Sequence, residues 1–69
     1  MTIIPVESST LAGYFYFEAQ QTLHIEFKDG RAYQYFDVPQ HVVDELAASD
    51  SKGRFLNTLI KGTYRYARV

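Results

Sequence analysis

The sequence predicts an α+β fold, a three-stranded antiparallel meander followed by two helices packed on one face (β-β-β-α-α), to which short terminal strands can be added. Aromatic and aliphatic residues alternate with other residues between positions 11 and 36, as in half-buried strands. The Asp29-Gly30 pair separates two of these alternating segments, which is typical of a tight hairpin. After Pro39, apolar residues recur at helical spacing in two further segments.

The size and composition of the chain limit what it can be. Its 69 residues and 8.0 kDa allow one domain, over residues 1–69. A chain this short buries about 60 % of the surface that it exposes when unfolded, so we expect a free energy of unfolding of about 3–10 kcal/mol. The absence of cysteine excludes disulfides and thiolate chemistry. No apolar run approaches the roughly 18 residues of a membrane helix and no basic segment opens the chain, so we expect a cytoplasmic protein without membrane contact.

Three segments have the alternation expected of strands, over residues 11–17, 22–27 and 32–36. Residues 2–9 contain a proline and paired serines, which favours an extended segment or an edge strand. The alternation returns at residues 64–69, which predicts a short strand or an arm. The terminal segments therefore add to the meander without changing its order.

Strict alternation assigns the side chains of the first strand to two faces. Phe15 and Phe17 follow Leu11 at even spacing, and we expect these side chains in the core. Tyr14 and Tyr16 then lie on the opposite face. The face that the helices leave uncovered is therefore expected to carry tyrosines.

The turn at the Asp-Gly pair allows two registers with opposite consequences. A two-residue turn pairs Phe27 with Ala32, which places Phe36 on the core face and turns Tyr33 and Tyr35 away from it. A three-residue turn with a glycine bulge shifts the register by one residue and sends both tyrosines to the core side. We favour the two-residue turn, and the sequence alone leaves both open.

Two helices are expected after the third strand. Pro39 suits the first turn of a helix that ends near Ser49. Its apolar stripe consists of Val42, Val43, Leu46 and Ala47. Ser51 is a candidate N-cap for a second helix that Gly62 ends. The apolar face of that helix consists of Phe55, Leu56, Leu59 and Ile60.

Charge divides the chain into two parts. Residues 1–50 hold eight acidic and two basic residues, a net charge of −6, whereas residues 51–69 hold five basic residues and no acid. The basic end can bind nucleic acid, or it can complement the acidic part within the fold, which is the interpretation that we favour. Within it, Ser51 and Gly53 at the start of the second helix, with Lys52 and Arg54, form a candidate anion site.

The aromatic content gives a second candidate surface, since 11 of the 69 residues are Tyr or Phe. A sheet face carrying Tyr33 and Tyr35 beside basic residues has the composition of a surface that stacks the bases of single-stranded RNA. The same face could instead be the seam of a homodimer or a contact for another protein, with Tyr14 and Tyr16 as further members. Aromatic residues also favour strands for purely structural reasons.

No arrangement of catalytic or metal-binding residues is found. His24 and His41 are the two histidines, and a zinc site would need carboxylates to complete its ligands. His24 is most simply a partner of Glu26 or of a tyrosine. The serines lie outside any nucleophile-elbow motif, and the glycines are too isolated to form a phosphate loop. We expect no enzyme activity, no cofactor and no bound metal.

An ordered set of short motifs runs through residues 3–65. Its members are Val6 with Ser8-Ser9, Gly13-Tyr14, Leu23-x-x-x-Phe27 with Gly30, Tyr33-x-Tyr35, Val38-Pro39, Ser51-x-Gly53, Phe55-x-Asn57, Ile60 and Tyr64. Together they resemble the KTSC domain, a short module named after the C-terminal region of some lysyl-tRNA synthetases and also found as small bacterial or phage proteins. The family shows an acid after its Gly-Tyr pair, where this chain has Phe15. The resemblance implies no established activity, and the synthetase association points toward RNA.

The residues and the resemblance together predict a small non-enzymatic binding module whose partner is single-stranded RNA or tRNA. The alternative is a protein-interaction or self-associating module with no role in nucleic-acid binding. The expected RNA contacts are two stacking tyrosines and four cations that bind phosphates: Tyr33, Tyr35, Lys52, Arg54, Lys61 and Arg65.

Overall fold

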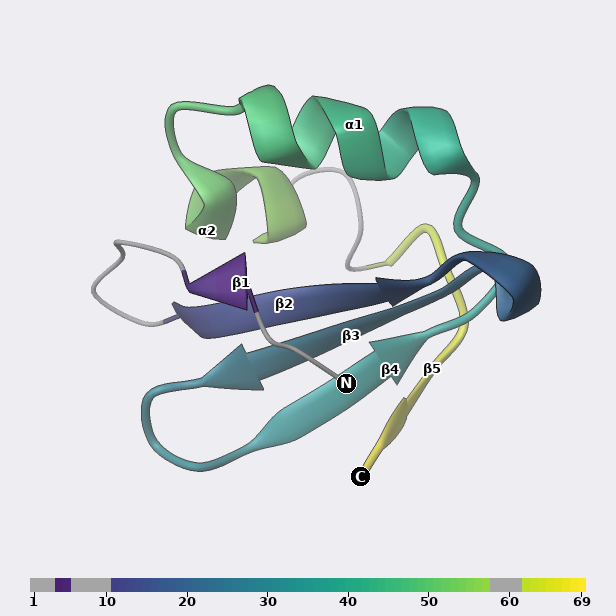
Figure 1. Cartoon of the computed structure of the whole chain (residues 1–69). Coiled ribbons are helices and arrows are strands. Elements are labelled where there is room, and N and C mark those ends of the chain that lie inside the picture. The colour runs from purple at the N-terminus through teal and green to yellow at the C-terminus, as the bar shows by residue number, and fades with distance from the viewer. Residues whose placement is uncertain (1–3, 6–10, 58–61) are drawn as a thin grey trace.

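The computed structural model describes residues 4–5, 11–57 and 62–69, which form one five-stranded sheet and two helices (Figure 1). The strands are β1 (Ile4–Pro5), β2 (Leu11–Phe17), β3 (Thr22–Phe27), β4 (Ala32–Tyr35) and β5 (Tyr66–Arg68), and a 3₁₀ turn, η1 (Glu18–Gln20), joins β2 to β3. The helices are α1 (Gln40–Ala48) and α2 (Lys52–Phe55). None of the described helices is long and apolar enough to cross a membrane.

The sheet is an antiparallel meander in the order β1-β2-β3-β4-β5, and α1 and α2 lie on the same side of it (Figure 1). The predicted α+β class and the three central strands are confirmed. The terminal segments both join the sheet, one at each edge. At the C-terminal edge, the N–H of Phe36 donates to the carbonyl of Arg65 at 2.8 Å, and the N–H of Val69 donates to that of Ala32 at 3.0 Å. β5 thus satisfies backbone groups of β4 that would otherwise lie at an edge.

An irregularity in β2 reverses the expected faces of that strand. Leu11 pairs with Phe27, but the register shifts before the next pair, so one extra residue is inserted. Leu11 and Tyr14, three residues apart, are therefore both in the core, with exposures of 2 % and 6 %. Tyr16 packs against the same core. The expected arrangement, with Tyr14 and Tyr16 on the open face, is wrong.

Phe15 and Phe17 lie on the other face of β2, where the prediction placed the tyrosines. Both side chains are half-buried, and their rings meet edge to face with centroids 5.1 Å apart. Their assignment to the core is wrong, because strict alternation fails across a bulge. Two other phenylalanines, Phe27 and Phe55, are partly buried against the core.

The hairpin between β3 and β4 adopts the three-residue turn, so the favoured two-residue register is wrong. The N–H of Phe27 donates to the carbonyl of Arg31 at 2.8 Å, and Ile25 is paired with Tyr33. Gly30 has a φ of +97°, the left-handed conformation that a glycine bulge requires. Asp29 accepts a hydrogen bond from the backbone N–H of Arg31 at 3.0 Å, which stabilises this turn. The register sends the β4 tyrosines to the core side.

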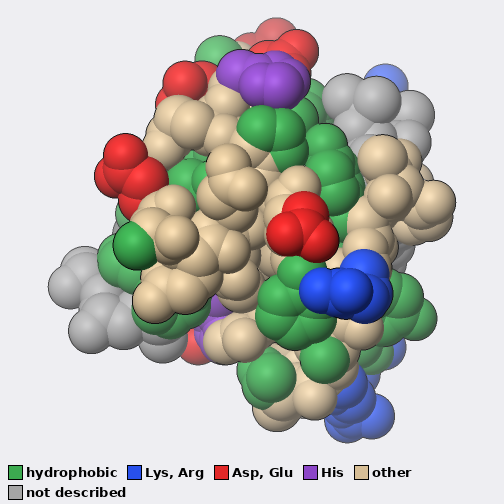
Figure 2. Space-filling model, turned by 90° about the vertical axis from the view of Figure 1, so that its right-hand side faces the viewer, with side chains coloured by type: hydrophobic (Ala, Val, Ile, Leu, Met, Phe, Trp, Pro, Cys, Tyr) green, Lys and Arg blue, Asp and Glu red, His purple; other side chains and the backbone are tan. Residues whose placement is uncertain are grey.

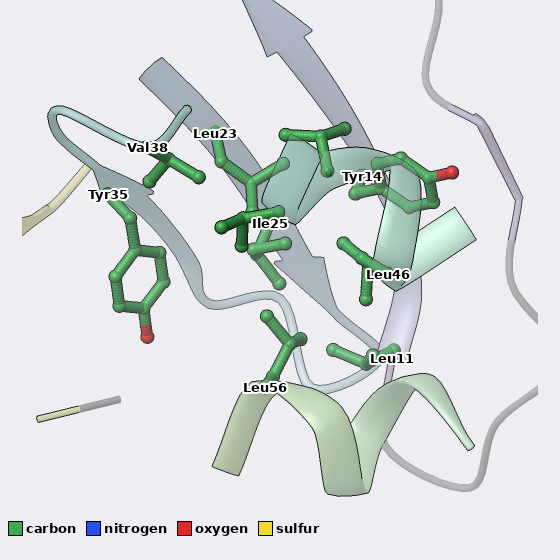
Figure 3. Packing of buried hydrophobic residues seen from close by; sticks show 10 residues of the cluster. Leu11, Tyr14, Leu23, Ile25, Tyr35, Val38, Leu46 and Leu56 are labelled. Carbon is green, nitrogen blue, oxygen red and sulfur yellow. The ribbon is translucent and has the colours of Figure 1, made fainter. Parts of the chain in front are cut away.

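The helices close the core from one side (Figure 3). α1 begins after Pro39, ends before Ser49 and buries three of its four predicted apolar residues, whereas Ala47 is exposed. α2 follows Ser51, as predicted, although no side-chain hydrogen bond caps it. Of its predicted apolar face, Leu59 and Ile60 lie outside the described residues. The core consists of Leu11, Tyr14, Leu23, Ile25, Tyr35, Val38, Val42, Val43, Leu46 and Leu56.

Candidate functional site

A hollow of about 380 Å³ opens where β3, β4 and β5 meet. We call it the aromatic hollow, and its lining residues are Phe27, Arg31, Tyr33, Tyr35, Gly62 and Tyr66. Phe27 comes from the end of β3, the next three residues from the hairpin and β4, and Tyr66 from β5. Among the described residues, no atom lies within 4 Å of the position that a Cβ at Gly62 would take. The meander thus brings three separate segments to one site.

Four rings form a continuous chain of contacts in the aromatic hollow. The rings of Phe27 and Tyr33 meet edge to face at 5.7 Å, and those of Tyr33 and Tyr66 do so at 5.8 Å. The ring of Tyr66 also lies 5.5 Å from that of Tyr35, tilted by 37°. Tyr66 is 57 % exposed, whereas Tyr35 is 2 % exposed and closes the inner end. The hollow therefore has a buried inner end and an accessible outer ring.

Burial raises the pKa of Tyr35 above its ordinary value, and the neighbouring Tyr66 and Tyr33 raise it further. Figure 3 shows Tyr35 at one side of the core and Tyr14 at the other. The Tyr35 ring thus belongs to both the core and the hollow. Its phenol stays protonated at neutral pH, so the inner end of the hollow is uncharged.

An arginine is held at the rim by two neighbours. The Nε of Arg31 donates to a carboxylate oxygen of Asp29 at 2.7 Å, and its guanidinium lies 5.5 Å from the centroid of the Phe27 ring. The backbone N–H of Arg31 is the main group that lowers the pKa of Asp29, and the charges of Arg31 and Arg68 lower it further. The carboxylate is therefore ionised and positions the guanidinium.

A second arginine lies on the same face of the sheet. Arg68 is the cross-strand partner of Tyr33, and such partners project to one face. Arg31 precedes Tyr33 by two residues and also lies on that face. Two guanidinium groups therefore flank one half-buried tyrosine, with Asp29 as the nearby acid. The rim of the aromatic hollow carries a local excess of positive charge.

The predicted RNA contacts do not converge on one site. Tyr33 and Tyr35 line the aromatic hollow, although Tyr35 offers almost no accessible surface. The guanidinium of Arg65 stacks on Phe36 at 5.3 Å, outside the lining. Lys52 and Arg54 lie on α2, and the Nζ of Lys52 donates to the carbonyl of Ser49 at 3.1 Å. Lys61 lies outside the described residues.

The candidate anion site at the start of α2 is partly occupied by local contacts. The N–H of Ser51 donates to the Oγ of Ser49 at 3.2 Å, and that hydroxyl donates to the carbonyl of Ser51 at 3.1 Å. Gly53 is half-buried within the four-residue helix. The two serines that flank Asp50 therefore hydrogen-bond to each other at the start of α2.

The two histidines lie apart. The Nε2 of His24 is 3.1 Å from a carboxylate oxygen of Glu26, as predicted, and its Nδ1 is 3.3 Å from the amide nitrogen of Gln34. His24 is buried, with 6 % exposure, whereas the Glu26 side chain is 40 % exposed. His41 is exposed on α1. Among the described residues, no group of three or more His, Cys, Asp or Glu side chains could hold a metal ion.

The basic end of the chain is only weakly complemented by acids. Within the described part of residues 51–69, the one ion pair is that of Arg65 with Asp37, at 3.8 Å between side chains that are both more than 70 % exposed. Figure 2 shows acidic side chains mainly toward the top and left of one face and basic side chains mainly toward its lower right, with one acidic group beside them near the centre. Complementation by acids within the fold, the interpretation that we favoured, therefore accounts for little of the positive charge of residues 51–69.

Residue-by-residue reasoning missed Arg31, Gly62, Tyr66 and Arg68 as members of the site or its rim. Tyr66 and Arg68 lie in the C-terminal segment whose alternation was noted, but the strand that it pairs with was not known. Pairing that segment with the third strand would have placed Tyr66 beside Tyr35. The sequence therefore contained the alternation that identifies this strand, but it did not specify the strand with which it pairs.

Comparisons with known proteins support the fold described above. The KTSC domain family matches residues 7–66. A protein of Tsukamurella paurometabola is 43 % identical over 88 % of this chain and 91 % of its own length. A lysine–tRNA ligase of Nostoc sp. is 37 % identical over 97 % of this chain, which spans only 12 % of that enzyme. The crystal structure of a KTSC domain protein from Yersinia pestis superposes with a TM-score of 0.91 at 32 % identity, covering 99 % of this chain and 96 % of the other.

These matches and the α+β fold define a small domain of the kind found both alone and within larger enzymes. The chain belongs to the KTSC domain family. The resemblance noted in the sequence is thereby confirmed.

Proposed function

We propose that this chain is a non-enzymatic module that binds single-stranded RNA at the aromatic hollow. Tyr33 and Tyr66 provide rings for base stacking, and Arg31 and Arg68 provide positive charge for phosphates. Further phosphate contacts along the bound strand come from the predicted cations Lys52, Arg54, Lys61 and Arg65. Tyr35 closes the hollow from inside and is not a stacking surface.

One observation carries this proposal: the accessible ring of Tyr66 contacts Tyr33 and Tyr35, and two arginines, Arg31 and Arg68, lie on the same sheet face next to Tyr33. Proteins that bind single strands combine rings for the bases with cations for the backbone. The hollow brings both within one sheet face. The lysine–tRNA ligases that contain a similar segment act on a tRNA, which supports RNA as the partner and the cytoplasm as the location.

The test is a titration of the isotope-labelled protein with a short single-stranded RNA at two ionic strengths. We expect amide shifts at residues 31–35 and 66–68, and an affinity that falls steeply with salt because phosphate contacts release counterions. Each phosphate contact contributes a slope of about −0.7 in log K against log salt for single strands, so Arg68→Ala reduces the slope by about that amount. An absence of shifts at low salt would end the proposal.

A second candidate function rests on the position of β5 at the edge of the sheet. Its side chains Tyr66 and Val69 are exposed, and an uncovered edge strand can pair with an extended segment of another protein. If the protein self-associates through this edge, light scattering detects the dimer, which RNA binding does not require. In that case Tyr66→Ala weakens the association, and added RNA shifts no resonance.

A further inference from the structure

We propose that the aromatic hollow accommodates a single nucleotide, with its base against the rings of Tyr33 and Tyr66 and its phosphate between Arg31 and Arg68. This inference rests on the proposed function, because the nucleotide is one unit of the bound strand. It goes further in assigning the two parts of the nucleotide to two parts of the site.

The size of the hollow limits its occupant to one small unit. About 380 Å³ is at the small end of the range of ligand sites, roughly 300–1,000 Å³. The buried ring of Tyr35 closes the inner end of the hollow, and the exposed ring of Tyr66 lies at its outer end. A planar base enters such a space edge first, whereas a paired base within a duplex cannot reach it.

The arrangement of the rings favours a planar ligand. Tyr33 contacts Phe27 and Tyr66 edge to face, so the neighbouring rings already hold its orientation. Tyr66 touches Tyr33 and Tyr35 and still leaves more than half of its surface accessible. A ring that is positioned by its neighbours loses little freedom when a base stacks on it.

The charge at the rim decides between two classes of ligand. Clusters of aromatic rings can bind a methylated ammonium group through cation–π contacts. Here two guanidinium groups flank Tyr33, and Asp29 offsets only one of them. The net local charge therefore opposes a cation and attracts an anion. A phosphate attached to a planar base satisfies both the rings and the arginines.

Arg31 is positioned to bind a phosphate with little loss of side-chain freedom. Its Nε is held by Asp29 at 2.7 Å and its guanidinium plane by the Phe27 ring at 5.5 Å. Because Asp29 is contacted through Nε, the terminal nitrogens point along the remaining edge of the guanidinium group. Arg68 on the neighbouring strand supplies the second donor group across Tyr33. Two donor groups on a fixed sheet face suit an oxyanion with several acceptor oxygens.

The experiment compares four probes by NMR titration: adenosine 5′-monophosphate, adenosine, inorganic phosphate and a short single-stranded oligoadenylate. We expect the monophosphate to shift residues 31–35 and 66–68, and to bind at least about tenfold more tightly than adenosine or phosphate, since it makes both contacts. The oligoadenylate shifts the same residues and binds more tightly still.

Two pairs of variants locate the contacts. Tyr66→Ala lowers the affinity for the monophosphate by about 5- to 150-fold, the loss of one stacked base. Val69→Ala truncates a similarly exposed side chain just after β5, outside the lining of the hollow, and leaves the affinity unchanged. Arg68→Ala weakens the monophosphate and leaves adenosine unaffected. Ala47→Glu lowers the net charge by the same amount at an exposed position of α1, outside the lining of the hollow, and leaves monophosphate binding unchanged. Dispersed amide spectra confirm that each variant is folded.

The outcomes separate the inference from the proposed function. If the oligoadenylate shifts residues 31–35 and 66–68 but the monophosphate does not bind, the single-nucleotide site is wrong and RNA binding at the hollow stands. If the monophosphate binds at the hollow and the oligoadenylate does not, the site is one for free nucleotides and the RNA proposal fails. Equal affinity for adenosine and its monophosphate overturns the role of the arginines. If no probe binds, both proposals fail.

Discussion

The hydroxyl of Tyr16 donates a hydrogen bond of 2.5 Å to the backbone carbonyl of Val38. The N–H of Val38 in turn donates to the carbonyl of Gln21 at 2.9 Å. Val38 is completely buried, so its two backbone groups need these partners to compensate for the loss of water. The contact ties β2 to the segment that leads into α1 and thereby sets where the helix layer begins.

Replacing Tyr16 by Phe removes that hydrogen bond while keeping the ring. We expect the free energy of unfolding to fall by about 0.5–1.5 kcal/mol, measured by urea denaturation, because the Val38 carbonyl loses a buried donor. Tyr66→Phe removes a hydroxyl from an exposed side chain and should change stability by less than about 0.5 kcal/mol. Equal stability of Tyr16→Phe and the unaltered protein would show that the bond contributes nothing.

Substitution of Gly30 tests the three-residue turn. Its φ of +97° is disfavoured for residues with a Cβ, so Gly30→Ala should destabilise the fold by about 1–2 kcal/mol. The added carbon meets no atom within 4 Å, so the cost is conformational and not a clash. Gly30→Asn should cost less, because Asn tolerates positive φ better than Ala. Identical effects of Ala and Asn in urea denaturation would contradict this explanation.

Truncations in the core should have effects that are large for so small a domain. Leu46 is 1 % exposed, and Leu46→Ala is expected to cost about 2–5 kcal/mol, a large part of the total of roughly 3–10 kcal/mol. Ile25→Val removes one methylene at a fully buried site and should cost about 0.5–1.5 kcal/mol. Glu45→Gln on the exposed side of α1 serves as the control. A stable, unperturbed Leu46→Ala protein would contradict the placement of α1 over the core.

Stability should decrease at alkaline pH. Burial raises the pKa values of Tyr14, Tyr16 and Tyr35 above the ordinary 10.0, while the same groups ionise normally in the unfolded chain. Below about pH 10 both states are protonated and the stability is constant; above it the unfolded state loses protons first, so unfolding becomes more favourable. The contribution is lost as the pH rises toward the folded-state pKa values.

Thermal melts and tyrosinate absorbance between about pH 8 and 12 measure this effect. Tyr35→Phe removes one of the three groups and should make the decline less steep, whether or not the variant is itself less stable at neutral pH. A melting temperature that stays constant across this range would contradict the burial of the three phenols.

Much of the fold follows from local patterns in the chain. The helical stripe of Val42, Val43 and Leu46 predicted α1 nearly to its ends, because a period of 3.6 residues is a property of the local sequence. Asp29-Gly30 located the hairpin for the same reason. The ordered set of short motifs also identified the family.

The faces of the strands could not be obtained in that way. One inserted residue between Leu11 and Tyr14 changes the side on which the following residues lie, and a turn of three residues instead of two does the same for Tyr33 and Tyr35. Each choice changes the local chain by one residue, yet it moves the later side chains of the strand to the opposite face, because the side-chain period of a strand is two. In the observed registers, Tyr14 of β2 and Tyr35 of β4 pack in one cluster with the apolar stripe of α1.

The amino-acid sequence thus determined the class of the fold, the number of helices, the position of the hairpin and the unequal distribution of charge. Only the tertiary structure decided which tyrosines are buried and which one remains accessible, and it placed Tyr66 against Tyr35 and Arg68 opposite Tyr33. The physical reason is that these contacts join segments about thirty residues apart, whose register depends on backbone pairing between β4 and β5 and not on the composition of either segment.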